Sequence, residues 1–157
     1  DLSRDDVVTG LLNERAFREV FDHDWAVAAR EKSSLAVVAF TLDEFGAYVD
    51  VFGRHAADSA LRRVGQAILR CLRRASDVVA RGADSSFLVL SHAADEDNVR
   101  DFAAQISAAV RELGLHHPRS SNSRFVTVSY EVAAAVPATD KRDAEGFITE
   151  LLRASAS

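Results

Sequence analysis

The sequence predicts an α/β fold in which helices pack on a single sheet. Segments with apolar residues at helical spacing alternate with short segments that are almost continuously apolar, and polar loops separate the two kinds. The 157 residues are 48% hydrophobic and 27% charged, which is typical of a globular protein. We therefore expect residues 1–157 to form one domain.

Each expected element rests on its own pattern. Helices are indicated by apolar residues three or four positions apart, such as Phe17, Phe21 and Trp25, and by capping residues such as Asn13. Strands are indicated by apolar segments between polar residues, and Gly53 separates two helices. The elements are a helix over 13–29, a strand over 34–42, helices over 43–52 and 55–73, strands over 77–81 and 87–91, a helix over 95–113, a strand over 124–136 and a helix from 143.

Charge and composition exclude several classes of protein. The net charge of −5 argues against a nucleic-acid binder. No apolar segment has the length of a membrane span and no signal peptide opens the chain, so we expect no membrane contact. The one cysteine, Cys71, cannot form an internal disulfide, which fits a cytoplasmic protein. Methionine is absent even from position 1, so we expect a fragment of a larger multidomain protein.

Four segments carry a recognisable pattern: DVVTGLLNERAF (6–17), TLDEFGAYVDVFGRHAAD (41–58), RASDVVARGADSSFLVL (74–90) and VTVSYEVA (126–133). In order and spacing they resemble the motifs of GGDEF domains, the diguanylate cyclase family. Those motifs are D-x-L-T-G-L-x-N-R-x-x-F, D-x-D-x-F-K-x-x-N-D-x-x-G-H-x-x-G-D, R-x-x-D-x-x-x-R-y-G-G-D-E-F and V-T-x-S-x-G-V-A. The resemblance implies a fold like that of the nucleotide cyclases, with a central, mainly antiparallel sheet flanked by helices.

The resemblance also describes the chemistry of active members. They join two GTP molecules, each held by one domain of a dimer, into cyclic di-GMP, with the help of divalent metals. The family takes metal ligands from two acidic positions, which here are Thr41 and Ser85. Neither hydroxyl is an anion at neutral pH, so we expect no bound metal, no required cofactor, no catalytic residues and no cyclase activity.

Several other residues of the family's substrate site are replaced in this sequence. The paired glycines correspond to Ala83 and Asp84, and Val49 stands where the family has a guanine-reading Asn. Asp58 survives at the second guanine-reading position, and Asp43 also matches the family motif. Asp58 and Asp43 either mark a relict nucleotide site or have only a structural role.

One ligand site keeps both of its residues. RASD (74–77) has the R-x-x-D form of the family's inhibitory site, the I-site, which binds cyclic di-GMP. The Arg74 guanidinium can donate to guanine O6 and N7, and the Asp77 carboxylate can accept from N1–H and N2–H. The structural alternative is that Arg74 ends a basic helix and Asp77 caps a turn. The family often adds a second arginine from the next helix, and that position is Gln105 here.

We expect an inactive GGDEF domain that binds cyclic di-GMP through Arg74 and Asp77 and signals to a protein partner, as effectors of the PopA type do. One alternative is a nucleotide-free module for homodimerisation or protein interaction. Another is a GTP-binding regulator of an attached domain, acting through Asp58. Ser85 or Ser86 with His92 and Asp84 would suggest a nucleophilic triad, but the strand–nucleophile–helix turn of such enzymes is missing.

Overall fold

The structure is a computed structural model that describes residues 3–92 and 95–156. The described elements follow the predicted order, and all but one of their boundaries lie within about two residues of the expected positions. They are α1 (Glu14–Glu31), β1 (Leu35–Leu42), α2 (Phe45–Cys71), β2 (Val78–Arg81), β3 (Ser86–Ser91), α3 (Glu96–Glu112), β4 (Val128–Ala135) and α4 (Ala144–Ala156).

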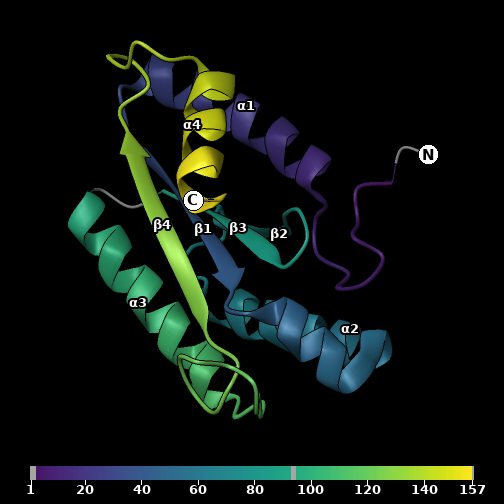
Figure 1. The fold of residues 1–157 in the computed structure, drawn as a ribbon. Helices are drawn as coiled ribbons and strands as arrows, with labels where there is room; N and C mark the ends of the chain where they lie inside the picture. Colours follow the sequence, from purple (N-terminus) through teal and green to yellow (C-terminus); the bar gives the residue numbers. More distant parts are fainter. Residues whose placement is uncertain (1–2, 93–94, 157) are drawn as a thin grey trace.

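The strands form one sheet in the order β2-β3-β1-β4, and every neighbouring pair is antiparallel (Figure 1). β1 lies inside the sheet, and its residues Val37, Val38 and Phe40 have no exposed surface. The continuous apolar run of β1 is therefore explained by burial on both faces. The predicted antiparallel sheet flanked by helices is confirmed.

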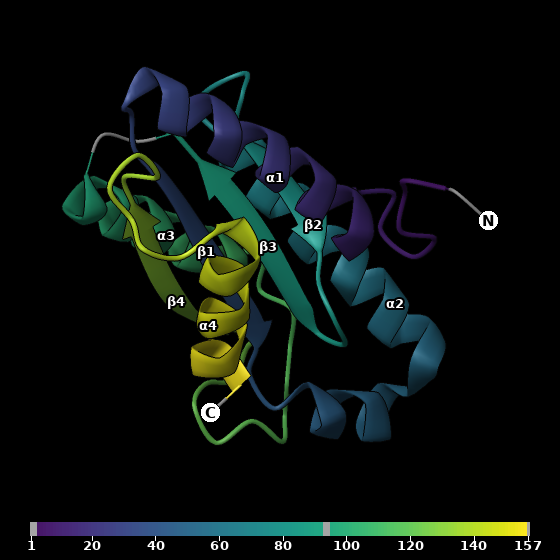
Figure 2. The same ribbon diagram turned by 90° about the horizontal axis from the view of Figure 1, so that it is seen from above.

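Helices cover both faces of this sheet. α2 and α3 lie on one face, where Phe40, Phe87 and Ile106 belong to one buried cluster. α1 and α4 lie on the other, where Phe21 and Phe147 belong to a second cluster. Figure 2 shows α1 and α4 on the near side of the sheet and α3 on the far side. Arg74, Asp77 and Asp43 lie on the connections between these elements.

The predicted strand over 124–136 is wrong at its start, because β4 begins only at Val128. The preceding residues pair with a loop instead. The His117 N–H donates to the Arg124 carbonyl at 2.7 Å, and the Val126 N–H donates to the Leu115 carbonyl at 2.7 Å. β1 ends at Leu42, and beyond it the Asp43 N–H donates to the Thr127 carbonyl at 2.9 Å.

The predicted break at Gly53 is confirmed. Gly53 has φ 85° and ψ 171° inside α2, a conformation open essentially to glycine alone. α2 begins at Phe45 rather than Asp43, because Glu44 is left-handed and the Asp43 carboxylate accepts a bond from Thr127 Oγ1 at 2.7 Å. No helix within the described residues is long and apolar enough to cross a bilayer.

Candidate functional site

The RxxD corner, residues 73–77, connects the end of α2 to β2. Leu72 leaves the helix with an extended backbone, and the Asp77 N–H donates to the Arg74 carbonyl at 3.0 Å. One side of the corner is thus anchored to a long helix and the other to a strand of the sheet. Such a short, anchored connection can hold side chains in a defined arrangement.

Asp77 is a buried carboxylate at this corner, with a side chain that is only 2% exposed. Its Oδ1 accepts a hydrogen bond from the His92 backbone N–H at 3.1 Å and lies 3.3 Å from Nδ1 of the His92 ring. The other ring nitrogen, Nε2, lies 3.0 Å from Asp24 Oδ2 on α1. His92 therefore links the corner to α1, and Asp77 faces His92 rather than solvent.

Arg74 is the exposed member of the pair. Within the described part of the chain its guanidinium makes no ion pair or hydrogen bond. Its neighbour Arg73 is held in place: the Arg73 guanidinium lies 5.1 Å from the centre of the Phe102 ring and donates to Gln105 Oε1. Gln105, which aligns with the family's second arginine, thus fixes a different arginine beside Arg74.

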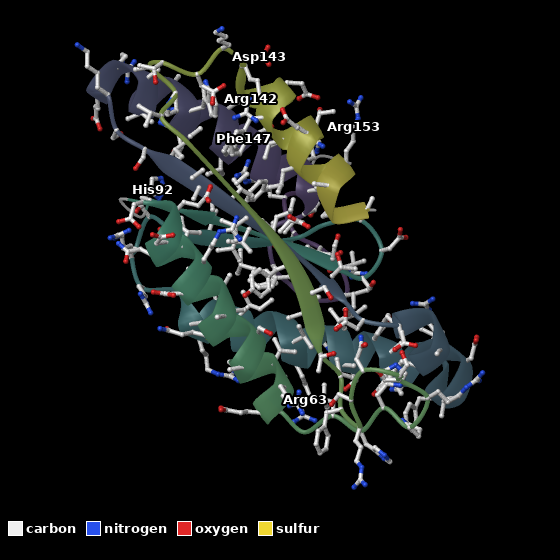
Figure 3. All side chains as sticks on the ribbon, turned by 60° about the vertical axis from the view of Figure 1, so that its left-hand side comes forward. Arg63, His92, Arg142, Asp143, Phe147 and Arg153 are labelled. Atoms are coloured by element: carbon white, nitrogen blue, oxygen red, sulfur yellow. The ribbon has the colours of Figure 1, made fainter. Side chains whose placement is uncertain are left out.

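His92 is the residue of this corner that sequence analysis missed. The pattern suggested only a triad with Ser85 or Ser86, but β3 runs from Ser86 to Ser91 and separates them from His92. Figure 3 shows His92 near the N-terminal end of α3. No regular spacing relates Asp24, Asp77 and His92, so the sequence held no signal for their contact.

The tip of the β2–β3 hairpin, residues 83–86, is closed by bonds within the hairpin. Ser86 Oγ donates to the Ala83 carbonyl at 2.5 Å, and Arg81 Nε donates to the Asp84 carbonyl at 3.0 Å. Arg81 also pairs with Asp6 at 3.3 Å, which ties the hairpin to the N-terminal loop. Asp84 adopts a left-handed backbone with φ 54°. The tip is a well-held turn, but its polar groups bond mainly to one another.

The position of the family's first metal ligand lies beside this tip. Thr41 pairs with Ser86 on β3 and with Ser129 on β4, so three hydroxyl residues form a row across the sheet. Both oxygens of the nearby Asp43 are engaged, because Thr127 Oγ1 and Ser129 Oγ donate to them at 2.7 and 2.5 Å. Hydroxyl donors and an occupied carboxylate fit a divalent metal poorly. Among the residues that the structure describes, no cluster of three or more His, Cys, Asp or Glu side chains is suited to a metal.

Asp58 lies apart from the RxxD corner, on the second half of α2. Its carboxylate is 4.0 Å from Arg54 Nη1, one helical turn earlier, and its side chain is 29% exposed. Val49, at the family's guanine-reading position, is partly buried against the core. The structure thus gives Asp58 a partner on its own helix, and the Val49 side chain has no group that could form a hydrogen bond with a base.

A buried histidine, His117, lies in the loop before β4. His117 is 1% exposed, and its Nε2 lies 2.9 Å from the Glu44 carbonyl oxygen. Bonds from Ser121 and Ser120 hold the pKa of the Glu44 carboxyl below its ordinary value. These contacts join the loop to the start of α2, so they have a structural role.

The comparison with protein families decides the class of the chain. The family model described as "Diguanylate cyclase, GGDEF domain" matches residues 3–152. The chain is a GGDEF domain. Its fold and its four sequence motifs agree with that assignment, which confirms the predicted family.

Curated relatives include both a cyclase and a phosphodiesterase. The domain is 30% identical over 131 residues to diguanylate cyclase DosC of Escherichia coli K12, covering 83% of this chain and 28% of DosC. It is 32% identical over 133 residues to cyclic di-GMP phosphodiesterase PdeR of the same organism, covering 83% of this chain and 20% of PdeR. The chain thus spans less than a third of the length of these two relatives.

Solved structures show the same fold. The GGDEF domain of DgcB from Caulobacter crescentus, in complex with c-di-GMP, aligns with a TM-score of 0.84 at 22% identity, over 98% of this chain and 85% of that one. The FimX GGDEF domain from Pseudomonas aeruginosa aligns with a TM-score of 0.81 at 18% identity, over 99% and 93%. Diguanylate cyclase SiaD from P. aeruginosa, in complex with its activator SiaC, aligns with a TM-score of 0.76 at 21% identity, over 97% and 59%.

Proposed function

We propose that this GGDEF domain is catalytically inactive and binds cyclic di-GMP at the RxxD corner, as the receptor part of a signalling protein. The observation that carries the proposal is the exposed, unpaired Arg74 guanidinium on a corner anchored by α2 and β2. A guanidinium without an internal partner keeps its donors available for a guanine edge or a phosphate.

Arg73 supports the same proposal. Gln105 and the Phe102 ring fix its guanidinium next to Arg74, so less side-chain entropy is lost when a ligand binds. Two adjacent arginines can neutralise the phosphates of cyclic di-GMP while one of them contacts a base. The complex of DgcB with c-di-GMP supports the ligand assignment, since DgcB shares this fold.

Asp77 can contact the ligand only under one condition. Its carboxylate is buried against His92, so a guanine can reach it only if the His92 contact opens. Arg74 therefore makes the first contact with the ligand in our proposal. Asp77 either follows through a local opening or holds the corner in shape.

The proposed lack of activity rests on the hydroxyl row and on Asp43. Thr41 and Ser85 cannot supply the anionic oxygens that a divalent metal requires at neutral pH. A GTP-binding role through Asp58 has less support, because the Asp58 carboxylate faces Arg54 on its own helix. A nucleotide-free interaction module remains the alternative to a receptor. The SiaD–SiaC complex supports a protein contact by one member of this fold.

Isothermal titration calorimetry with cyclic di-GMP tests the receptor proposal. We expect binding by the unmodified domain and a loss of about 10- to 100-fold in affinity in Arg74→Ala, the range for one bidentate arginine contact. Arg111→Ala, an exposed arginine on α3 without a described partner, should bind as the unmodified domain does. No heat with the unmodified domain, or equal affinity in Arg74→Ala, would overturn the proposal.

Incubation with GTP and magnesium tests the lack of activity separately. We expect no cyclic di-GMP in the chromatogram, and detection of the product would overturn that part. Thermal melting with GTP then separates the alternatives, because a ligand that binds only the folded state raises the melting temperature. Stabilisation by GTP that is lost in Asp58→Ala would favour the GTP-binding regulator.

A further inference from the structure

The second half of α2 is positively charged, and the arginines that lie on it are not part of the proposed receptor site. Between Ser59 and Ser76 the sequence has five arginines and no acidic residue, although the whole chain has a net charge of −5. Three of these arginines, Arg62, Arg63 and Arg70, line a hollow of about 320 Å³ together with Gln66 and Leu113. We call this hollow the arginine groove. Figure 3 places Arg63 near the C-terminal end of α3.

The arginines of the groove have no counterions among the residues that the structure describes. Arg62, Arg63 and Arg70 are exposed, and none makes an ion pair or hydrogen bond within the described residues. Two arginines on other helices pair with acidic residues of their own helix. Arg18 pairs with Glu14, and Arg100 pairs with Glu96, each at 3.4 Å and one turn apart.

Folding alone does not explain this arrangement. A cation in the last turn of a helix interacts favourably with the helix dipole, which accounts for Arg70. Arg62 and Arg63 lie more than two turns before the helix end at Cys71, beyond the reach of that effect. Neighbouring charges of one sign repel each other, so the uncompensated arginines lower the stability of the free domain.

The surroundings of the groove indicate the class of partner. Leu113 gives it an apolar wall, and Leu69, which is 42% exposed, lies on the same face of α2 as Arg62. Guanidinium groups bind carboxylates through paired hydrogen bonds, and arginine is enriched in protein–protein interfaces. A long polyanion such as DNA would meet repulsion from the rest of an acidic domain, whereas a short segment contacts the groove alone.

We propose that the arginine groove is a docking site for an acidic segment of another protein, with one apolar side chain packed against Leu113. This inference does not require cyclic di-GMP binding. The two surfaces are nevertheless neighbours, since Arg70 lies in the last turn of α2 and Arg74 follows four residues later. A bound segment would therefore lie beside the RxxD corner.

Fluorescence anisotropy tests the proposal with a short fluorescein-labelled peptide of aspartate and glutamate residues around one leucine. We expect binding that weakens with added salt, because solution ions screen exposed charges. Affinity should fall about tenfold or more in the triple variant Arg62→Gln, Arg63→Gln, Arg70→Gln. Replacing the peptide leucine by alanine should weaken binding several-fold.

A matched control removes three positive charges elsewhere, with Arg30→Gln, Arg119→Gln and Arg153→Gln. This control should keep most of the affinity, and circular dichroism should show that both triple variants are folded. Absence of peptide binding, or equal losses in the two triple variants, would overturn the proposal. So would preferential, groove-dependent binding of duplex DNA or phosphatidylserine vesicles, or self-association that the first triple variant abolishes.

Discussion

The RxxD corner and the tip of the β2–β3 hairpin belong to one stretch of chain, but they use their polar groups differently. At the corner, Arg74 is exposed and unpaired within the described residues, while Asp77 is buried and bonded to His92. At the tip, Ser86 and Arg81 bond to carbonyls of the same turn. The hairpin can therefore keep its shape without any ligand, whereas the corner keeps a charged group directed at solvent.

The residues that hold a site in shape are therefore different from the residues that would carry its chemistry. Arg81 holds the tip through Asp6 and the Asp84 carbonyl, and neither contact depends on the residue at position 85. Acidic residues at the tip can thus be lost without loss of the fold. The corner carries its charge on a side chain that folding does not use.

The largest effect should come from removing the partner of the buried carboxylate. In His92→Ala, Asp77 loses its ring contact and Asp24 loses its contact at 3.0 Å. Within the described residues, Asp77 keeps only the bond from the backbone N–H of residue 92, and because hydrogen bonds to charged groups contribute more than neutral ones, we expect the free energy of unfolding to fall by about 1–3 kcal/mol. Urea unfolding followed by circular dichroism measures this. The exposed histidine variant His23→Ala should change the stability by no more than about 0.5 kcal/mol.

The same variant tests the role of Asp77 in ligand binding. If guanine must displace His92 from Asp77, the folded His92→Ala protein should bind cyclic di-GMP at least as tightly as the unmodified domain. A large loss of affinity in this variant, with the fold intact, would show instead that the His92 contact holds the corner in its binding shape.

The second prediction concerns the tip, where acidic residues are restored at the two positions that supply metal ligands in the family. In Thr41→Asp with Ser85→Glu, the hydroxyl row gains one carboxylate, and the hairpin tip gains another at position 85, whose carbonyl accepts from the Leu42 N–H. If metal binding needs only those acids, magnesium at ten times its dissociation constant should stabilise the variant by about 1.4 kcal/mol. This corresponds to a rise of about 3–6 °C in melting temperature.

The neutral variant Thr41→Asn with Ser85→Gln is the matched control. For this variant, and also for the unmodified domain, the melting temperature with magnesium should equal the melting temperature with a chelator. Equal magnesium effects in the acidic and neutral variants would mean that the tip has no metal preference, and that other losses, such as the occupied Asp43, prevent binding.

The fold could be predicted from the sequence wherever a pattern is local. Asn13 was expected to cap a helix, and its Oδ1 accepts from the Ala16 N–H at 2.8 Å. The apolar run of β1 predicted burial on both faces, and Gly53 predicted the break in α2. The start of β4 was not predictable, because Arg124 and Val126 pair with His117 and Leu115 in the preceding loop, and no local pattern marks that pairing.

For the site, the sequence predicted which positions of the chain are involved, but not the burial or the contacts of their side chains. The spacing of RASD placed Arg74 and Asp77 on one corner, but it did not predict that the Asp77 side chain is buried. That burial depends on α1 and β3 packing together, which brings Asp24 and His92 to the corner. Likewise, the charges of α2 are visible in the sequence, whereas their lack of partners depends on what α3 places beside them.

The smallest expected effect concerns the turn at the hairpin tip. Asp84 has φ 54°, and its side chain makes no hydrogen bond or ion pair within the described structure. Glycine adopts this backbone without the clash of a Cβ atom, so Asp84→Gly should stabilise the domain by a few tenths to about 1 kcal/mol. Gly82→Ala is the contrasting variant, because a Cβ there would lie 2.5 Å from Ser86 Oγ. A clear loss of stability in Asp84→Gly, measured by urea unfolding, would mean that the aspartate has a role at the tip, and the contrast with the RxxD corner would then weaken.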